Sequence, residues 1–329
     1  MKLATLRDGS PDGVLHVVSR DLTRSVAASS IAPTLQAALE QWDQIAPLLE
    51  RLYGELNEGA QKGAALETRN LEAPLPRAWQ WLDASAFHSH GDLLEKVFGL
   101  EPPPEKRSVP LMYQGAGDEL LGPNDDVRLP SEEDGMDFEA ELVAIVDRVE
   151  MGTTAANAEK HIKLLAIAND VSLRVLAAKD LQTGFGFLQS KGATSFGPVA
   201  VTPDELGDAW SDGRVHLPII VRRNGVEFGR PECGPMGFSF GELIAHAART
   251  RNLCAGTIIG SGTISNANFR EVGSACIAER RAIELIDEGT PRTGYLNFGE
   301  RVRIEMLGAD GNSVFGAIDQ QYVRASLNQ

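Results

Sequence analysis

The sequence predicts a β-rich α+β protein with a small N-terminal domain. Short apolar, β-branched segments outnumber the helical patterns, and they do not alternate with helices as βαβ units would. A proline-bearing segment at residues 71–77 is typical of a linker. We therefore expect a small domain over residues 1–75 and a large one over residues 76–329.

The individual elements follow from local patterns. Thr34 is a plausible N-cap, Asn224-Gly225 is typical of a hairpin turn, and Ser239 with Glu242 forms a capping-box pattern. We expect helices at residues 35–56, 92–98 and 239–249. We expect strands at residues 14–18, 110–115, 136–146, 164–172, 217–223, 302–306 and 314–318, and one more entering a Gly-rich loop at 258–266.

The segment at residues 136–146 reads as an interior strand that carries two acids. Side chains of a strand alternate faces with a period of two, so Glu139 and Glu141 point the same way, roughly 6.5–7 Å apart at their roots. Two like charges in a poorly solvated place need a cation or must stay protonated. A hard divalent ion, Mg²⁺ or Ca²⁺, fits that need. The alternative is a strand whose acidic end opens onto water.

Other chemical candidates stand at the ends of elements. Asp170 ends a buried-looking strand and is a further candidate ligand. Asp83, His88 and His90 fall within eight residues. They could be a metal cluster, a catalytic base with its neighbours, or part of a surface loop. Lys191 follows an aromatic run.

Composition limits the class of protein. The 329 residues are 43% hydrophobic and 23% charged, with a formal net charge of −15, which argues against nucleic acid or an anionic membrane as partner. The three cysteines are far apart without a CxxC pattern, so neither a zinc site nor a disulfide framework is indicated. The start of the chain is charged too early for a signal peptide, and no apolar run approaches the length of a membrane span. We expect a cytoplasmic, reducing setting.

Over residues 76–320 the chain resembles the fumarylacetoacetate hydrolase superfamily. The paired glutamates, the Asn-Asp-x-Ser pattern and the Gly-Ser-Gly-Thr-Ile-Ser pattern occur in the family's order. The matching segments are Trp81-Leu82-Asp83 with His90, Leu111-Met112-Tyr113-Gln114-Gly115, Phe138-Glu139-Ala140-Glu141-Leu142, Asn169-Asp170-Val171-Ser172, Gln189-Ser190-Lys191, residues 260–265 and Ala278-Glu279.

The resemblance implies a fold, a site and an assembly. The fold would be a mixed β-sandwich roll with a small SH3-like β-domain in front, and the assembly a homodimer. A divalent metal would be held by Asp83, Glu139, Glu141 and Asp170. A dyad of His90 and Glu279 would activate water, and Lys191, Tyr113 and Thr263 would contact the substrate or the developing anion.

The implied reaction is hydrolysis of a C–C bond in a fumarylacetoacetate-like diketo acid, as in the breakdown of tyrosine and other aromatic compounds. A divalent ion polarises a carbonyl and stabilises an enolate, and a histidine near neutral pKa takes a proton from water. A second reading keeps the site but makes the enzyme a 2-oxo acid decarboxylase, hydratase or isomerase. A third is a binding protein in which the acids only hold the fold.

Overall fold

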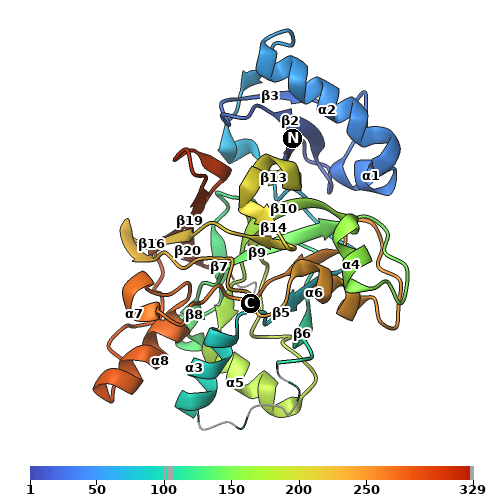
Figure 1. Cartoon of the computed structure of the whole chain (residues 1–329). Helices are drawn as coiled ribbons and strands as arrows, with labels where there is room; N and C mark the ends of the chain where they lie inside the picture. The colour runs from blue at the N-terminus through green and yellow to red at the C-terminus, as the bar shows by residue number, and fades with distance from the viewer. Residues whose placement is uncertain (99–100, 102–104, 106, 327–329) are drawn as a thin grey trace.

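The computed structural model describes residues 1–98, 101, 105 and 107–326 (Figure 1). In this part of the chain the largest sheet has 11 strands, in the order β4-β3-β2-β1-β13-β10-β9-β18-β5-β6, with β12 paired to β10. Its strands are β1 (Lys2–Leu6), β2 (Val14–Val18), β3 (Arg24–Ala27), β4 (Ala64–Ala65), β5 (Trp81–Ala84), β6 (Met112–Gly115), β9 (Ala140–Val146), β10 (Ile162–Asn169), β12 (Ser195–Phe196), β13 (Ala200–Val201) and β18 (Ile258–Gly260).

A second sheet of five strands has the order β17-β16-β19-β20-β7. It consists of β7 (Val127–Leu129), β16 (Ile219–Arg223), β17 (Val226–Gly229), β19 (Arg301–Leu307) and β20 (Ser313–Arg324). Two short pairs complete the strands: β8 (Met136–Asp137) with β11 (Ser172–Leu173), and β14 (Trp210–Ser211) with β15 (Arg214–Val215). The predicted β-rich α+β class is confirmed.

The helices lie mainly at the two ends of the molecule (Figure 1). Helices α1 (Leu35–Glu40) and α2 (Trp42–Glu58) accompany the N-terminal strands at one end, and α3, α5, α7 and α8 lie at the other. The remaining helices are α3 (His88–Phe98), α4 (Ala155–Ala158), α5 (Arg174–Thr183), α6 (Phe240–Ala247), α7 (Phe269–Val272) and α8 (Ile277–Glu288). Short 3₁₀ turns occupy Thr68–Asn70, Glu132–Asp134, Glu159–His161 and Pro203–Ala209. Among the helices described, none combines the length and the apolar character that crossing a bilayer requires.

Several local predictions are confirmed and two are corrected. Thr34 caps α1 by accepting from the Ala37 N–H, and Ser239 and Glu242 form the capping box of α6. The helix predicted over residues 35–56 is two helices, because the backbone at Gln41 leaves helical geometry. The strand predicted over residues 136–146 is also two, β8 and β9, with residues 138–139 between them.

The central strand β9 is buried on both faces, as predicted. Leu142 and Ala144 belong to one hydrophobic core. Val143 and Ile145 belong to a second core, together with Leu3, Leu15 and other N-terminal residues. Side chains alternate faces along a strand, so β9 separates the two cores. One core therefore packs residues of the N-terminal segment with residues of the central strand β9.

Candidate active site

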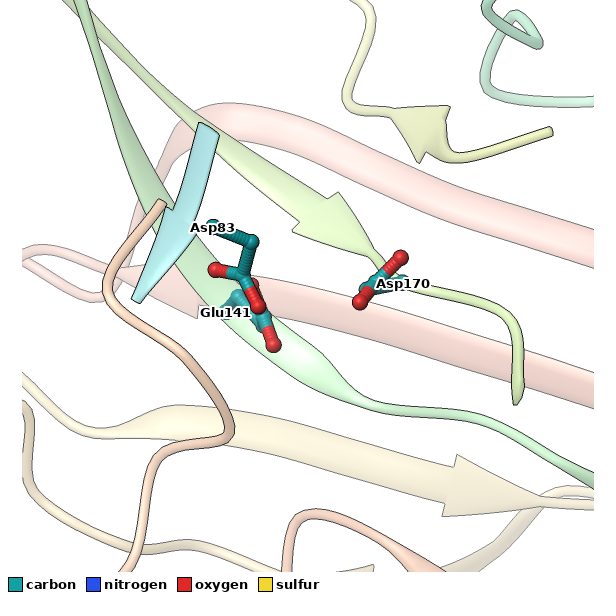
Figure 2. A group of neighbouring side chains, drawn as sticks. All are labelled: Asp83, Glu141 and Asp170. Atoms are coloured by element: carbon teal, nitrogen blue, oxygen red, sulfur yellow. The ribbon is translucent and has the colours of Figure 1, made fainter. Parts of the chain in front are cut away.

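Three buried carboxylates meet at the middle of the large sheet (Figure 2). Asp83 lies on β5, Glu141 on β9, and Asp170 directly follows β10. Each offers an oxygen within 4.8 Å of the oxygens of the other two. Strand β9 lies between β10 and β18, and β18 pairs with β5. The sheet therefore brings Asp83 and Asp170, which are 58 and 29 positions from Glu141 in the sequence, next to Glu141.

The chemistry of these acids fits a divalent cation. Both carboxylate oxygens of Glu141 are buried without a hydrogen-bond partner among the described residues. Burial, followed by the negative charge of Asp170, raises the pKa of Asp83 to about 8. Burial and the charge of Asp83 also raise the pKa of Glu141 well above its ordinary value. Carboxylates that repel each other in a dry place are strongly favoured by a bound cation, and hard oxygen ligands suit Mg²⁺, Ca²⁺ or Mn²⁺.

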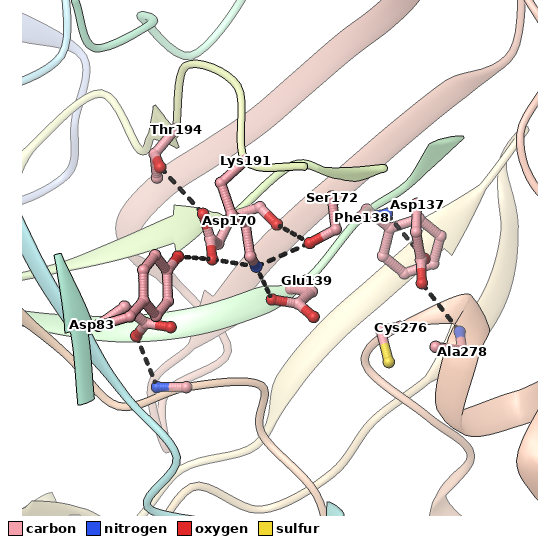
Figure 3. A network of polar contacts seen from close by, with 12 residues as sticks. Asp83, Asp137, Phe138, Glu139, Asp170, Ser172, Lys191, Thr194, Cys276 and Ala278 are labelled. Atoms are coloured by element: carbon pink, nitrogen blue, oxygen red, sulfur yellow. Dashed lines mark hydrogen bonds and ion pairs between the residues drawn. The ribbon is translucent and has the colours of Figure 1, made fainter. Parts of the chain in front are cut away.

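Glu139 is not one of these three acids, and two cations bind it: Lys191, which Figure 3 shows, and Arg174. Its Oε1 accepts from Arg174 at 2.5 Å and its Oε2 from Lys191 at 2.7 Å. Burial alone would raise the pKa of Glu139, but Arg174 and Lys191 hold it below its ordinary value. Glu139 lies in the break between β8 and β9, so it is not part of the strand that carries Glu141.

Lys191 is the cation that joins the acids. Besides Glu139, its Nζ donates to Asp170 at 2.5 Å and to the Ser172 hydroxyl at 2.7 Å. The ammonium group also lies 5.5 Å from the centre of the Tyr113 ring. Burial lowers the pKa of Lys191, but Asp170 and Glu139 outweigh burial and raise it. Lys191 is therefore protonated and faces the carboxylate site.

Two hydroxyl groups orient Asp170. The Tyr113 hydroxyl donates to Oδ2 at 2.6 Å, and the Thr194 hydroxyl donates to Oδ1 at 3.1 Å. Thr194 in turn accepts from the buried indole N–H of Trp81 at 3.1 Å. Asp170 is thus fixed by neutral donors as well as by Lys191.

The Gly-rich loop after β18 lies against Asp83. The Gly262 N–H donates to Asp83 Oδ1 at 3.0 Å, so this backbone amide binds a carboxylate of the protein. A Cβ at Gly260 would collide with Asp83 Oδ1 and the Trp81 ring, which explains a glycine there. Thr263, the predicted substrate contact, is buried directly after Gly262.

His90 and Glu279 come together from α3 and α8. His90 Nδ1 lies 2.9 Å from Glu279 Oε2. A carboxylate accepts from a ring N–H, so Nδ1 carries the proton and Nε2 is left as the basic nitrogen. Glu279 is fully buried, and its Oε1 has no hydrogen-bond partner in the described part of the chain.

Sequence reasoning missed Arg174 and Asp137. Arg174 Nε donates to Asp137 at 2.8 Å, and the other end of the guanidinium reaches Glu139. A signal existed, since Arg174 follows the Asn-Asp-x-Ser pattern by two residues and Asp137 precedes Glu139 by two. Neither spacing shows that the two side chains meet.

Comparisons with known proteins place the chain in a family. A model of the C-terminal region of fumarylacetoacetate hydrolase matches residues 80–321, and one of the fumarylacetoacetase N-terminal domain 2 matches residues 1–77. The 2,4-didehydro-3-deoxy-L-rhamnonate hydrolase of Sphingomonas sp. strain SKA58 is 31% identical over 47% of this chain and 52% of its own length. The mitochondrial oxaloacetate tautomerase of Xenopus laevis is 29% identical over 47% of each chain. The chain spans about half the length of these curated relatives.

Solved structures support the same fold. Fumarylacetoacetate hydrolase from Exiguobacterium antarcticum has a TM-score of 0.67 at 17% identity. Maleylpyruvate hydrolase from Sphingobium sp. SYK-6, in complex with manganese(II) and pyruvate, has a TM-score of 0.66 at 18% identity. Each alignment covers 99% of this chain and 100% of the other. The chain belongs to the fumarylacetoacetate hydrolase family.

Proposed function

We propose that this protein is a divalent metal-dependent hydrolase that cleaves a C–C bond of a fumarylacetoacetate-like diketo acid. The observation that carries the proposal is a buried cluster of Asp83, Glu141 and Asp170 in a chain that also pairs His90 with Glu279. These three acids would hold the metal, and the predicted fourth ligand, Glu139, remains a prediction. Bound there, a divalent ion supplies charge to polarise a carbonyl and to stabilise an enolate.

The dyad supplies the base. His90 Nε2 takes a proton from water while the water oxygen bonds to the substrate carbonyl carbon. The Nδ1–H of His90 keeps its hydrogen bond to Glu279, which fixes the ring and balances the imidazolium charge. The C–C bond then breaks, its electron pair passes to the leaving carbon as an enolate, and the proton on Nε2 is returned to that carbon. The products are a carboxylic acid and a ketone, and the dyad is restored.

Lys191, Tyr113 and Thr263 are proposed as substrate contacts. The Lys191 ammonium is positioned by Asp170 and Glu139, so it can meet negative charge that develops on a substrate oxygen. A preorganised donor of this kind typically contributes about 3–4 kcal/mol to the transition state. The Tyr113 ring lies beside the Lys191 ammonium group, and the Tyr113 hydroxyl donates to Asp170.

A second function uses the same residues for isomerisation, decarboxylation or hydration of a 2-oxo acid. The observation that favours it is the similarity to oxaloacetate tautomerases. All of these reactions form an enolate, so the site geometry suits each of them. The predicted homodimer and cytoplasmic location stay predictions.

The test follows diketo acid and 2-oxo acid substrates by absorbance and identifies the products by NMR, with Mg²⁺, Ca²⁺, Mn²⁺ or a chelator. The proposal expects metal-dependent loss of the diketo absorbance and two smaller products. A rearranged or hydrated product with its carbon skeleton intact, or a product that has lost only CO₂, would assign the second function. Turnover that a chelator leaves unchanged would reject a metal-dependent enzyme.

A further inference from the structure

Asp137 is a fully buried carboxylate with every position around it filled by donors. Its Oδ1 accepts from the N–H groups of Phe138 at 2.8 Å and Ile277 at 2.7 Å. Its Oδ2 accepts from the Ala278 N–H at 2.9 Å and from Arg174 Nε at 2.8 Å. Figure 3 shows the carboxylate directed at the start of α8. With both oxygens occupied, Asp137 is not available to a metal or a substrate.

The two amides at Ile277 and Ala278 are those of the first turn of α8. The next amide, of Glu279, donates to the Cys276 sulfur at 3.3 Å. A helix leaves its first N–H groups without partners inside the helix, and a carboxylate satisfies them well. Asp137 therefore fixes where α8 begins, at Ile277, two residues before Glu279.

A series of ion pairs connects Asp137 to the carboxylate cluster. Arg174 joins Asp137 to Glu139, and Lys191 joins Glu139 to Asp170. Asp137 is thus the residue that contacts both the helix carrying Glu279 and the chain of ion pairs that ends at the proposed metal ligands. A buried carboxylate is costly unless it is fully paired, and an apolar residue would fill this place without that cost.

We propose that Asp137 is a positioning residue, which holds the first turn of α8 so that Glu279 and His90 stay in register with the carboxylate cluster. The inference rests on the proposed function of the His90–Glu279 dyad. In Asp137→Asn, one acceptor oxygen becomes an NH₂ group that faces a backbone N–H or the Arg174 guanidinium. The first turn of α8 then loses an anchor, and the Glu279 carboxylate shifts away from His90 Nδ1.

The test compares Asp137→Asn, Glu279→Gln and the double variant. Glu284→Gln is a matched control, because the Glu284 carboxylate also accepts from two backbone amides, of Arg292 at 2.7 Å and Thr293 at 2.8 Å, near the other end of α8. Two quantities are measured: kcat with Mg²⁺, and the low-field proton NMR signal of the His90 Nδ1–H, assigned by its loss in His90→Gln. Mn²⁺ affinity is measured alongside by paramagnetic resonance.

The expected result is a fall in kcat for Asp137→Asn within the about 10²–10⁴-fold that a general base supplies. The double variant should be no slower than Glu279→Gln, since both act through one proton transfer. The low-field signal should be lost or shifted in Asp137→Asn and kept in Glu284→Gln, while Mn²⁺ affinity stays within a few-fold of wild type. Additive losses, or an unchanged low-field signal in Asp137→Asn, would overturn the inference.

Failure of the proposed function is distinguishable from failure of this inference. A fully active Glu279→Gln rejects the dyad's role, whereas an impaired Glu279→Gln beside a fully active Asp137→Asn rejects the role of Asp137. If the protein turns over none of the substrates, the NMR signal alone decides on Asp137. If Asp137→Asn does not fold, Asp137→Glu replaces it. The glutamate keeps a negative charge for Arg174 and only displaces the carboxylate oxygens from the N–H groups of α8. The same loss of the low-field signal is expected, and an unchanged signal overturns the inference.

Discussion

Lys191 sets the charge balance among the carboxylates at the centre of the sheet. Its Nζ contacts Glu139, Asp170 and Ser172, and it is almost fully buried. The ammonium thus neutralises part of the acid cluster without occupying Glu141, whose oxygens stay unpartnered in the described structure. We therefore expect the loss of Lys191 to lower turnover without lowering metal affinity.

Replacing Lys191 with Met should lower turnover by about 10²–10³-fold, the usual effect of removing one preorganised donor to a developing anion. Affinity for Mg²⁺ should not fall, because the variant removes a positive charge beside Asp170. Turnover assays and calorimetric titration measure the two effects. Lys179→Met is the control, since Lys179 is exposed on α5 and should tolerate the change. Wild-type turnover in Lys191→Met would remove Lys191 from the site.

The His90–Glu279 contact predicts a non-additive double-mutant cycle. His90→Ala and Glu279→Gln should each reduce kcat by about 10²–10⁴-fold, the range of general-base catalysis. The double variant should be little slower than the slower single one, because both changes disable one proton transfer. The measurement is kcat at saturating metal for the four proteins. An active His90→Ala would move the base elsewhere, with His88 the first residue to test.

At this scale the sequence predicted which residue types gather, but not all of their partners. Asp83, Glu141 and Asp170 were expected in one place and are found there. Glu139 was expected to be a fourth ligand with Glu141, which stays a prediction, and its pairing with Arg174 and Lys191 was not foreseen. The spacing of two assumes one continuous strand, and a break in a strand cannot be read from residue periodicity alone.

At the scale of elements, local sequence patterns predicted five of the eleven strands of the large sheet, namely β2, β6, β9, β10 and β18. The other strands, the boundaries and the pairings came only with the structure. Residues 258–266 were expected as a strand entering a loop, and β18 ends at Gly260. Helix α5 (Arg174–Thr183) was not predicted, because its residues show no apolar stripe and none of them is fully buried. The parallel pairing of β18 with β5, which sets the Gly-rich loop against Asp83, depends on contacts 177 residues apart.

A substitution at Gly260, which is closely packed against Asp83, tests how β18 supports that residue, and Gly54, which has open space around it, provides the control. Gly260→Ala should lower the free energy of unfolding by about 1–3 kcal/mol and weaken metal binding, since its Cβ would collide with Asp83 and Trp81. Gly54→Ala is the control: Gly54 lies inside α2 with no atom within 4 Å of an added Cβ. It should gain about 0.5–1 kcal/mol from better helix propensity. Denaturant unfolding and metal titration check both, and unaltered metal affinity in Gly260→Ala would contradict the expected contact.

Across the whole molecule, the N-terminal segment and the large region share one sheet and one core. β1 pairs antiparallel with β13, and Leu3 and Leu15 pack in the core that contains Val143 and Ile145. The sequence indicated a linker near residue 74, but it could not show that a sheet crosses it, because strand pairing at this range has no local signal.

A chain of residues 76–329 alone should therefore fold poorly. This fragment lacks β1, so β13 has an unpaired edge and one face of β9 is uncovered. Exposed strand edges of this kind promote association. Circular dichroism, thermal unfolding and light scattering provide the measurement. A monomeric fragment as stable as the full chain would show that the two segments are independent.

The clustered acids also predict a dependence of stability on pH. The folded pKa of Asp83 is raised from 3.8 to about 8, so between these values the folded protein without metal keeps a proton that the unfolded chain has lost. Its stability should then fall as pH rises from about 4 to about 8. A metal replaces that proton, so the stabilisation by metal should grow over the same range.

The most direct measurement is the free energy of unfolding of the wild type and of Glu141→Gln near the upper end of this range, with and without Mg²⁺, Ca²⁺ or Mn²⁺. If Asp83, Glu141 and Asp170 form a metal site, wild type should gain about 2.7 kcal/mol at a hundredfold excess of metal over its Kd. Glu141→Gln should be at least as stable as wild type without metal, because it relieves repulsion, and should gain little from metal. If none of the three metals stabilises wild type, and Glu141→Gln is destabilised without metal, the acids are structural and the account is wrong.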